Sequence, residues 1–261
     1  MNRIDRKFKQ LRVSGKKAFI AFITAGYPSL AVTEKLILEF SKIGVDIIEL
    51  GVPFSDPMAD GPIIQQASKT ALEKGVNLDN IFSMVKECRK KTDIPICLMT
   101  YYNPVFRYGE KRFTNRANLS GVDGVIIPDL IPEEAKSFIK CARADNLSTI
   151  FFLAPTSTKE RIKLISSVST GFIYYVSLTG VTGPRKNLPE DCIKNISLIK
   201  QNTQKPVCVG FGISTSGQIK EINKNADGVI IGSSIVAKIK ENIGNSDLVS
   251  KVGGFVKDLI R

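Results

Sequence analysis

The 261-residue sequence contains no histidine and no tryptophan. Without histidine there is no imidazole base, no catalytic triad of the usual kind and no His-ligated metal, so acid–base chemistry must come from carboxylates, Tyr, Lys or Cys. We therefore expect no metal in the functional site. The longest apolar runs are about one strand long, well short of the roughly 18–20 residues that span a bilayer. We expect no contact with a membrane.

Signals for export and for a disulfide framework are also missing. The first ten residues, MNRIDRKFKQ, are charged and lack the apolar segment of a signal peptide. The cysteines form no CxxC pair, and their odd number argues against a disulfide framework. They are Cys88, Cys97, Cys141, Cys192 and Cys208. These features predict a cytoplasmic protein.

The chain carries an excess of basic residues, with a formal net charge of +12. A nucleic acid or another polyanion is one explanation of such an excess. The basic residues are spread over amphipathic segments without interleaved aromatic residues, which is typical of a solvated lysine-rich surface. We favour that interpretation and expect no nucleic-acid partner.

Short apolar runs alternate with amphipathic segments along the whole chain. The runs are continuous and β-branched, as in parallel strands that are covered on both faces. They occupy residues 18–26, 45–53, 94–102, 122–130, 148–155, 171–178, 205–212 and 226–233. Eight strands with intervening helices in about 250 residues predict an α/β fold, a (β/α)₈ TIM barrel. An open doubly wound sheet is the alternative.

The helical segments lie between these strands, and no linker divides the chain, so we predict a single TIM-barrel domain over residues 1–261. The predicted helices include 30–43, 62–74, 80–91, 132–144, 159–168, 188–201 and 216–223, with an extra N-terminal helix and an extra helix after the second strand. Ser29, Asp79 and Thr158 are expected to cap three of them. Asp46, Asp123 and Asp227 each begin a strand, and we expect them to stabilise the N-terminal rim.

Glu49 interrupts the second apolar run, near the C-terminal end of its strand. Strand alternation places it on the same face as Ile47 and Gly51. A buried carboxyl is costly unless it is protonated, paired or functional. One interpretation is a structural ion pair, but no nearby strand offers an obvious cation. We favour a carboxyl with a raised pKa at the barrel mouth, suited to proton transfer.

The loop PFSDPMADGP (53–62) follows this strand and is rich in Pro and Asp. A long irregular segment at the C-terminal rim of a barrel is typical of a binding loop. Asp60 precedes Gly61-Pro62 and has two interpretations: the N-cap of the next helix, or a second carboxylate brought over the mouth beside Glu49. Asp56, which precedes Pro57, could likewise be only a turn residue.

Glycine-rich segments follow the last three strands. They are LTGVTGPR (178–185), GFGIST (210–215) and IGSSI (231–235). Backbone N–H groups at such turns, backed by a helix N-terminus, form an anion cradle. The usual phosphate position of a barrel fits Gly212 with Gly232, Ser233 and Ser234. Residues 178–185 could also close over a ligand and bring Arg185 to the rim.

Two tyrosine pairs lie at or near strand ends, Tyr101-Tyr102 and Tyr174-Tyr175, and Asp129 ends the fourth strand. Successive strand residues point to opposite faces, so at most one tyrosine of each pair can line the mouth. Each of these tyrosines either packs in the barrel or contacts the substrate.

The segment ELGVPFSDPMADGP (49–62) resembles the signature of the tryptophan synthase alpha chain family. The resemblance extends over essentially the whole chain, through FITAGYP (22–28), NPVF (103–106), IIPDL (126–130), GVTG (180–183) and VGFGIS (209–214). It implies a lyase that cleaves indole-3-glycerol phosphate to indole and glyceraldehyde 3-phosphate. Glu49 matches the glutamate that protonates indole C3, and Asp60 matches the aspartate that accepts a hydrogen bond from the indole N–H.

The resemblance also implies a binding site and a partner. Phe22, Met99, Tyr101, Asp129 and Tyr174 match residues that line the indole pocket or position the glutamate, and Gly183, Gly212, Gly232 and Ser233 match those that hold phosphate. The chain itself needs no cofactor, because pyridoxal phosphate belongs to the beta chain on which it docks in an α2β2 heterotetramer.

Two alternatives remain: another phosphate-binding barrel of the same pathway, and a non-catalytic barrel that mainly activates the beta chain. The signature around Glu49 and Asp60 argues against both. We expect the isolated chain to be slow, with residues 53–62 and 178–190 mobile until ligand and partner order them.

Overall fold

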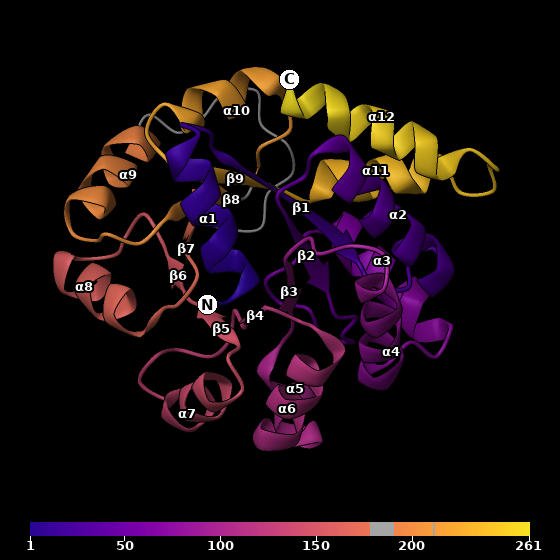
Figure 1. Cartoon of the computed structure of the whole chain (residues 1–261), viewed down its shortest axis with the longest axis horizontal. Coiled ribbons are helices and arrows are strands. Elements are labelled where there is room, and N and C mark those ends of the chain that lie inside the picture. The colour runs from indigo at the N-terminus through magenta and orange to yellow at the C-terminus, as the bar shows by residue number, and fades with distance from the viewer. Residues whose placement is uncertain (178–190, 211) are drawn as a thin grey trace.

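A ring of parallel strands forms the centre of the molecule. The structure is a computed structural model that describes residues 1–177, 191–210 and 212–261. The strand segments of these residues are β1 (Ala18–Thr24), β2 (Ile47–Gly51), β3 (Ile96–Met99), β4 (Gly124–Ile126), β5 (Ser148–Ile150), β6 (Phe152–Leu153), β7 (Ile173–Val176), β8 (Val207–Gly210) and β9 (Gly228–Ile231). Every strand pair is parallel, and the helices surround the ring (Figure 1).

The fifth predicted strand closes the barrel. The sheet order is β5-β4-β3-β2-β1-β9-β8-β7-β6, so β5 and β6 are its two ends. Only Phe151 separates them along the chain, and its carbonyl accepts a hydrogen bond from the Tyr174 amide of β7 (3.0 Å). One extended segment thus pairs with β4 through its first half and with β7 through its second. The predicted eight-strand barrel is confirmed, and the open sheet is not observed.

The helices that the structure describes are α1 (Arg3–Val13), α2 (Leu30–Ile43), α3 (Pro62–Glu73), α4 (Leu78–Arg89), α5 (Tyr102–Tyr108), α6 (Glu110–Ser120), α7 (Lys136–Ala144), α8 (Lys159–Val168), α9 (Asp191–Gln201), α10 (Ser216–Asn223), α11 (Ser233–Glu241) and α12 (Leu248–Ile260). The predicted extra helices, at the N-terminus and after the second strand, are present. The prediction named no helix for α5, α6, α11 or α12. None of the described helices is long and apolar enough to cross a membrane.

Several predicted helix ends were wrong. The helix expected from residue 132 begins at Lys136, because residues 132–135 form turns. The caps at Ser29 and Thr158 are confirmed, since their side chains accept hydrogen bonds from the Val32 and Arg161 amides. Asp79 is not a cap: α4 begins two residues earlier, at a capping box formed by Asn77 and Asn80.

The three aspartates at strand starts bind the neighbouring strands, as predicted. Each carboxylate accepts a backbone N–H from the strand beside its own, at 2.8 to 2.9 Å. The pairs are Asp46 with Phe19, Asp123 with Ile96, and Asp227 with Val207. These bonds fix the register of the sheet at its N-terminal rim.

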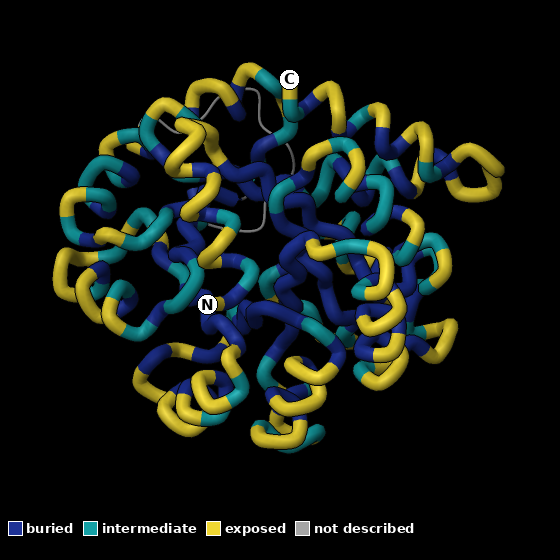
Figure 2. The backbone as a smooth tube through the Cα atoms, in the orientation of Figure 1, coloured by how far each residue is buried: buried dark blue, intermediate teal, exposed yellow. Residues whose placement is uncertain are grey.

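Helix α1 covers this N-terminal end of the barrel, and Figure 1 shows it lying across the ring of strands. The Asn2 side chain donates to the Asp123 carbonyl (2.6 Å), just before β4. Ile4 is fully buried, and a Cβ at Gly124 of β4 would lie 2.9 Å from the Ile4 Cδ1. Buried residues lie at the centre of the molecule, and exposed residues lie on its outer helices (Figure 2). The opposite, C-terminal end of the strands is therefore the end left for a site.

Candidate active site

Glu49 is the third residue of β2 and belongs to the inward face of the barrel. Its register partners are Phe22 of β1 and Cys97 of β3. Only 1% of Glu49 is exposed, and its Oε2 has no hydrogen-bond partner among the described residues. Within residues 1–177, 191–210 and 212–261 no ion pair includes Glu49, so the structural ion pair considered from sequence is not observed there.

Burial determines the protonation state of Glu49. Loss of solvation raises the pKa of this carboxyl from its ordinary value of 4.5 to about 8, and the negative charge of Asp60 adds to the effect. Burial disfavours the charged form because the interior solvates an anion poorly. At neutral pH Glu49 therefore holds its proton and can donate it.

Asp60 lies at the end of the loop that follows β2, and the N-cap interpretation was wrong. The N-cap of α3 is Gly61, with no side-chain cap. The Asp60 carboxylate instead accepts a hydrogen bond from the Tyr101 hydroxyl (3.2 Å), and 8% of the residue is exposed. Burial raises the pKa of Asp60 to about 6, and the bond from Tyr101 opposes that rise. At neutral pH Asp60 is mainly ionised while Glu49 is mainly neutral.

Tyr101 connects this loop to the barrel. Its hydroxyl donates to Asp60 and accepts from the Ala59 amide (2.8 Å). Its ring stacks on Phe54 of the loop, with centroids 5.1 Å apart and planes at 28°. Tyr102 points elsewhere and donates to Glu110 (2.9 Å), so the predicted division of this tyrosine pair is confirmed.

Phe22 lies on the inward face between two glycines of neighbouring strands. A Cβ at Gly51 of β2 would lie 2.6 Å from the Phe22 Cζ. One at Gly232, just after β9, would lie 3.2 Å from its Cδ1. Met99 is the register partner of Gly51 and is also buried. The two glycines thus leave the space that the Phe22 ring occupies at the barrel mouth.

Tyr174 lies across the barrel in β7. Its ring packs on Phe152 (centroids 4.7 Å apart) and over Gly210, where a Cβ would lie 2.4 Å from the tyrosine hydroxyl. Burial raises the pKa of Tyr174 well above its ordinary value, and the charges of Glu49 and Asp60 raise it further. Tyr174 is therefore grouped electrostatically with both carboxyls. Burial also raises the pKa of Tyr175, to about 12, but the residues that add to this rise are Cys192 and Asp191 of α9, on the outer side of the barrel.

Asp129 is exposed and lies at the rim rather than in the buried group. Its Oδ1 accepts a hydrogen bond from the Tyr102 amide (2.9 Å), the first N–H of α5. An acidic side chain at this place accepts a hydrogen bond from an N–H that has no partner within the helix, and its negative charge interacts favourably with the helix dipole. The structure therefore gives Asp129 a capping contact.

The predicted phosphate residues lie partly within the described chain. Gly212 has a φ of +75°, which favours glycine. Gly232 is the N-cap of α11, without a side-chain cap, and Ser233 is the first helical residue. The Ser234 Oγ is buried without a partner among the described residues. Gly183, Arg185 and the rest of residues 178–190 lie outside the described residues.

Two residues that the sequence reasoning missed lie beside this group. Phe54 stacks on Tyr101, and its only sequence signal is an aromatic residue in a polar loop. Thr24 ends β1, two residues after Phe22 and on the same face; it is 2% exposed, and its Oγ1 has no partner in the described parts of the chain. A lone hydroxyl at the end of an apolar run was the available signal. No group of three or more acidic or Cys residues in the described chain is placed to hold a metal ion.

Comparison with known proteins identifies a family for this chain. The family model for the tryptophan synthase alpha chain matches residues 8–256. The tryptophan synthase alpha chain of Geotalea daltonii is 48% identical over 259 residues, covering 99% of this chain and 98% of that protein.

Solved structures agree with this result. A crystal structure of tryptophan synthase subunit alpha from Legionella pneumophila has a TM-score of 0.89 at 34% identity, covering 100% of this chain and 97% of that one. A chain from the tryptophan synthase α2β2 complex of Pyrococcus furiosus has a TM-score of 0.86 at 37% identity, covering 93% and 97%.

Proposed function

Because this chain belongs to the tryptophan synthase alpha chain family, we propose that Glu49 and Asp60 carry out the cleavage of indole-3-glycerol phosphate that defines the family. Members of the family are lyase subunits of tryptophan biosynthesis and release indole and glyceraldehyde 3-phosphate. The observation that supports the assignment is the buried carboxyl of Glu49, whose Oε2 has no partner in the part of the chain that the structure describes, at the mouth that also holds Asp60.

Glu49 is the proposed proton donor and acceptor. The neutral carboxyl donates its proton to indole C3, which turns the ring into an indolenine cation. The bond between C3 and the glycerol side chain then breaks, and its electron pair restores the aromatic ring. The adjacent hydroxyl becomes the aldehyde and returns a proton to Glu49, so the enzyme ends in its starting state. A carboxyl with a pKa of about 8 suits both transfers near neutral pH.

Asp60 is the proposed charge stabiliser. Protonation at C3 places positive charge on the indole nitrogen, and an ionised carboxylate that accepts the N–H hydrogen bond stabilises it. The Tyr101 hydroxyl supports this role because its hydrogen bond favours the ionised form of Asp60. The two carboxyls thus take opposite protonation states for opposite tasks.

The remaining predicted residues complete the proposed substrate site. Phe22, Met99 and Tyr174 form apolar walls for the indole ring. We place the phosphate group at Gly212, Gly232 and Ser233, where the first N–H groups of α11 lack partners within the helix. Gly183 and Asp129 stay proposed substrate residues from the family resemblance. We also propose that residues 1–261 act as one domain, since β1 near the start pairs with β9 near the end.

Turnover of indole-3-glycerol phosphate by the purified chain, measured as indole release, tests the assignment. We expect Glu49→Gln to lower kcat by about 10²- to 10⁴-fold, the usual contribution of a positioned general acid. Glu73→Gln, at an exposed glutamate of α3, is the matched control and should retain wild-type turnover. Equal rates for Glu49→Gln and the wild type, with and without a beta chain, would favour the non-catalytic activator instead.

The family assembles with a beta chain, and we propose which surface of this chain contacts it. Met58, Phe106 and Ile131 are exposed by 78%, 66% and 46%. They follow the C-terminal ends of β2, β3 and β4, so three apolar side chains share one sector of the mouth. Apolar surface gathered in this way is typical of an interface. Pyridoxal phosphate would then be held by the beta chain, and this chain would need no cofactor.

A pair of matched substitutions tests this docking surface. Phe106→Glu should weaken binding of the beta chain, measured by calorimetry, while indole release by the isolated chain stays unchanged. Leu119→Glu on α6 has nearly the same exposure, 65%, and should not affect binding. Equal beta-chain affinity for both variants would exclude Phe106 from the interface.

A further inference from the structure

A large share of the chain's net positive charge lies at the end of the barrel opposite the mouth. Residues 1–17 contain seven Lys and Arg and a single acidic residue, so they hold half of the excess of 12 positive charges. These residues form α1 and its connection to β1, which cover the N-terminal end of the strands. The family's anionic substrate does not account for this cluster, because the proposed phosphate site lies at the other end.

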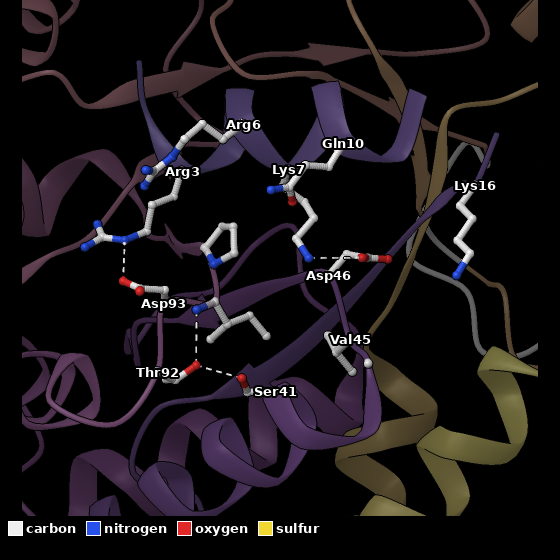
Figure 3. Close-up of a pocket in the computed structure, with 13 residues that line it drawn as sticks. Arg3, Arg6, Lys7, Gln10, Lys16, Ser41, Val45, Asp46, Thr92 and Asp93 are labelled. Atoms are coloured by element: carbon white, nitrogen blue, oxygen red, sulfur yellow. Dashed lines mark hydrogen bonds and ion pairs between the residues drawn. The ribbon is translucent and has the colours of Figure 1, made fainter. Parts of the chain in front are cut away.

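A hollow of about 630 Å³ lies between α1 and the N-terminal ends of β2 and β3. Figure 3 shows its lining: Arg3, Arg6, Lys7 and Gln10 come from α1, and Lys16, between α1 and β1, lies at the opposite end from Arg3 and Arg6. A second hollow of about 480 Å³ shares Lys16 and is also lined by Lys9, Arg12 and Lys17. Volumes of roughly 300 to 1,000 Å³ are usual for small-molecule sites.

The cations of the larger hollow are only partly neutralised. Its acidic residues are Asp46 and Asp93, and they pair with Lys7 (3.5 Å) and Arg3 (3.4 Å). Arg6 and Lys16 are exposed and take part in no ion pair of the described chain. The lining therefore keeps two positive charges in excess, together with the polar side chains of Gln10, Ser41 and Thr92.

We propose that this hollow binds a small anion of the phosphate class with at least two negative charges, such as an oligophosphate. Arg6 and Lys16 would contact its oxygens from two sides, and Arg guanidinium groups suit phosphate oxygens in particular. Because both cations are exposed, binding should weaken strongly with salt. The site is independent of the proposed lyase activity.

An NMR titration of the full-length, ¹⁵N-labelled chain with tripolyphosphate tests the proposal. At low salt we expect saturable shifts of the amide signals of α1 and of residues 41–46 and 92–94. The double variant Arg6→Gln/Lys16→Gln should bind about 25-fold more weakly, since each of its two lost charge contacts contributes roughly a factor of five. Its indole release should equal that of the wild type, which separates failure here from failure of the proposed function.

Two further variants make the test specific. Lys140→Gln/Lys163→Gln removes the same net charge from exposed lysines of α7 and α8, and it should bind tripolyphosphate within twofold of the wild type. Asp93→Asn removes a carboxylate from the rim and should tighten binding, a gain that misfolding cannot produce. An equal loss in both double variants, shifts confined to α11, or binding of a short RNA but not of tripolyphosphate would overturn the proposal.

Discussion

Replacing Glu49 with glutamine should change how the stability of the chain depends on pH. The wild-type carboxyl has a pKa of about 8 in the folded chain, because burial and the nearby Asp60 disfavour its ionised form. In the unfolded chain the same group ionises at its ordinary value, near 4.5. Between these values the folded state holds a proton that the unfolded state has lost, so the free energy of unfolding falls as pH rises.

The expected size of this effect follows from the two pKa values. Each pH unit inside the interval changes the free energy of unfolding by about 1.4 kcal/mol. From pH 5.5 to pH 7.5 the wild type should lose about 3 kcal/mol through this one group. Glutamine cannot ionise, so Glu49→Gln should not show this loss. Its advantage in stability over the wild type should therefore grow by about 3 kcal/mol across the same range.

Urea unfolding followed by circular dichroism at pH 5.5, 6.5 and 7.5 measures the difference, since the chain has no tryptophan for fluorescence. Other titrating groups, Asp60 among them, are common to both proteins and largely cancel in the comparison. Glu73→Gln, at an exposed position, should follow the wild type at every pH. A constant difference between Glu49→Gln and the wild type would mean that Glu49 ionises normally, and the proposed proton donor would lose its physical basis.

Two other substitutions test the support of the site. Tyr101→Phe removes the hydrogen bond that favours ionised Asp60; kcat/KM should fall by about tenfold, and the acidic limb of its pH profile should move upward from about pH 6. Gly51→Ala places a Cβ 2.6 Å from the Phe22 ring, so urea unfolding should show a loss of about 1 to 3 kcal/mol and KM should rise. Gly254→Ala in α12 meets no atom within 4 Å and should instead stabilise the chain by about 0.5 to 1 kcal/mol.

The inward orientation of Glu49 could be predicted because it is a local property of the chain. Side chains of a strand alternate between two faces, and the apolar run around Glu49 is long enough to fix its register with β1 and β3. The same reasoning predicted that at most one tyrosine of each pair faces inward, whereas the choice of Tyr101 and Tyr174 came from the family resemblance. The three rim aspartates were predicted for a similar reason, since each directly precedes a strand.

The environment of Asp60 could not be predicted from spacing alone. An aspartate before Gly-Pro is a normal helix cap, and only the contact with Tyr101, 41 residues away, makes it a buried acceptor. The start of α4 was missed because Asn77 and Asp79 both suit a cap, and the reciprocal bonds of Asn77 and Asn80 decide between them. The break at Phe151 was missed for a related reason: it depends on pairing with β7, which the segment itself does not encode.

Two buried carboxyls at opposite ends of the barrel show why stability and chemistry are separated in this fold. Asp123 is 3% exposed, and it accepts hydrogen bonds from Arg3, Arg89 and the Ile96 amide. Burial raises its pKa, but these partners act against the rise, so its charge is compensated and binds elements together. Glu49 is buried to a similar extent, and within residues 1–177, 191–210 and 212–261 its Oε2 has no such partner. A partner that stabilised the ionised form of Glu49 would lower its pKa and remove the proton that the proposed reaction needs, so the stability lost at this end must come from contacts elsewhere, such as those of Asp123.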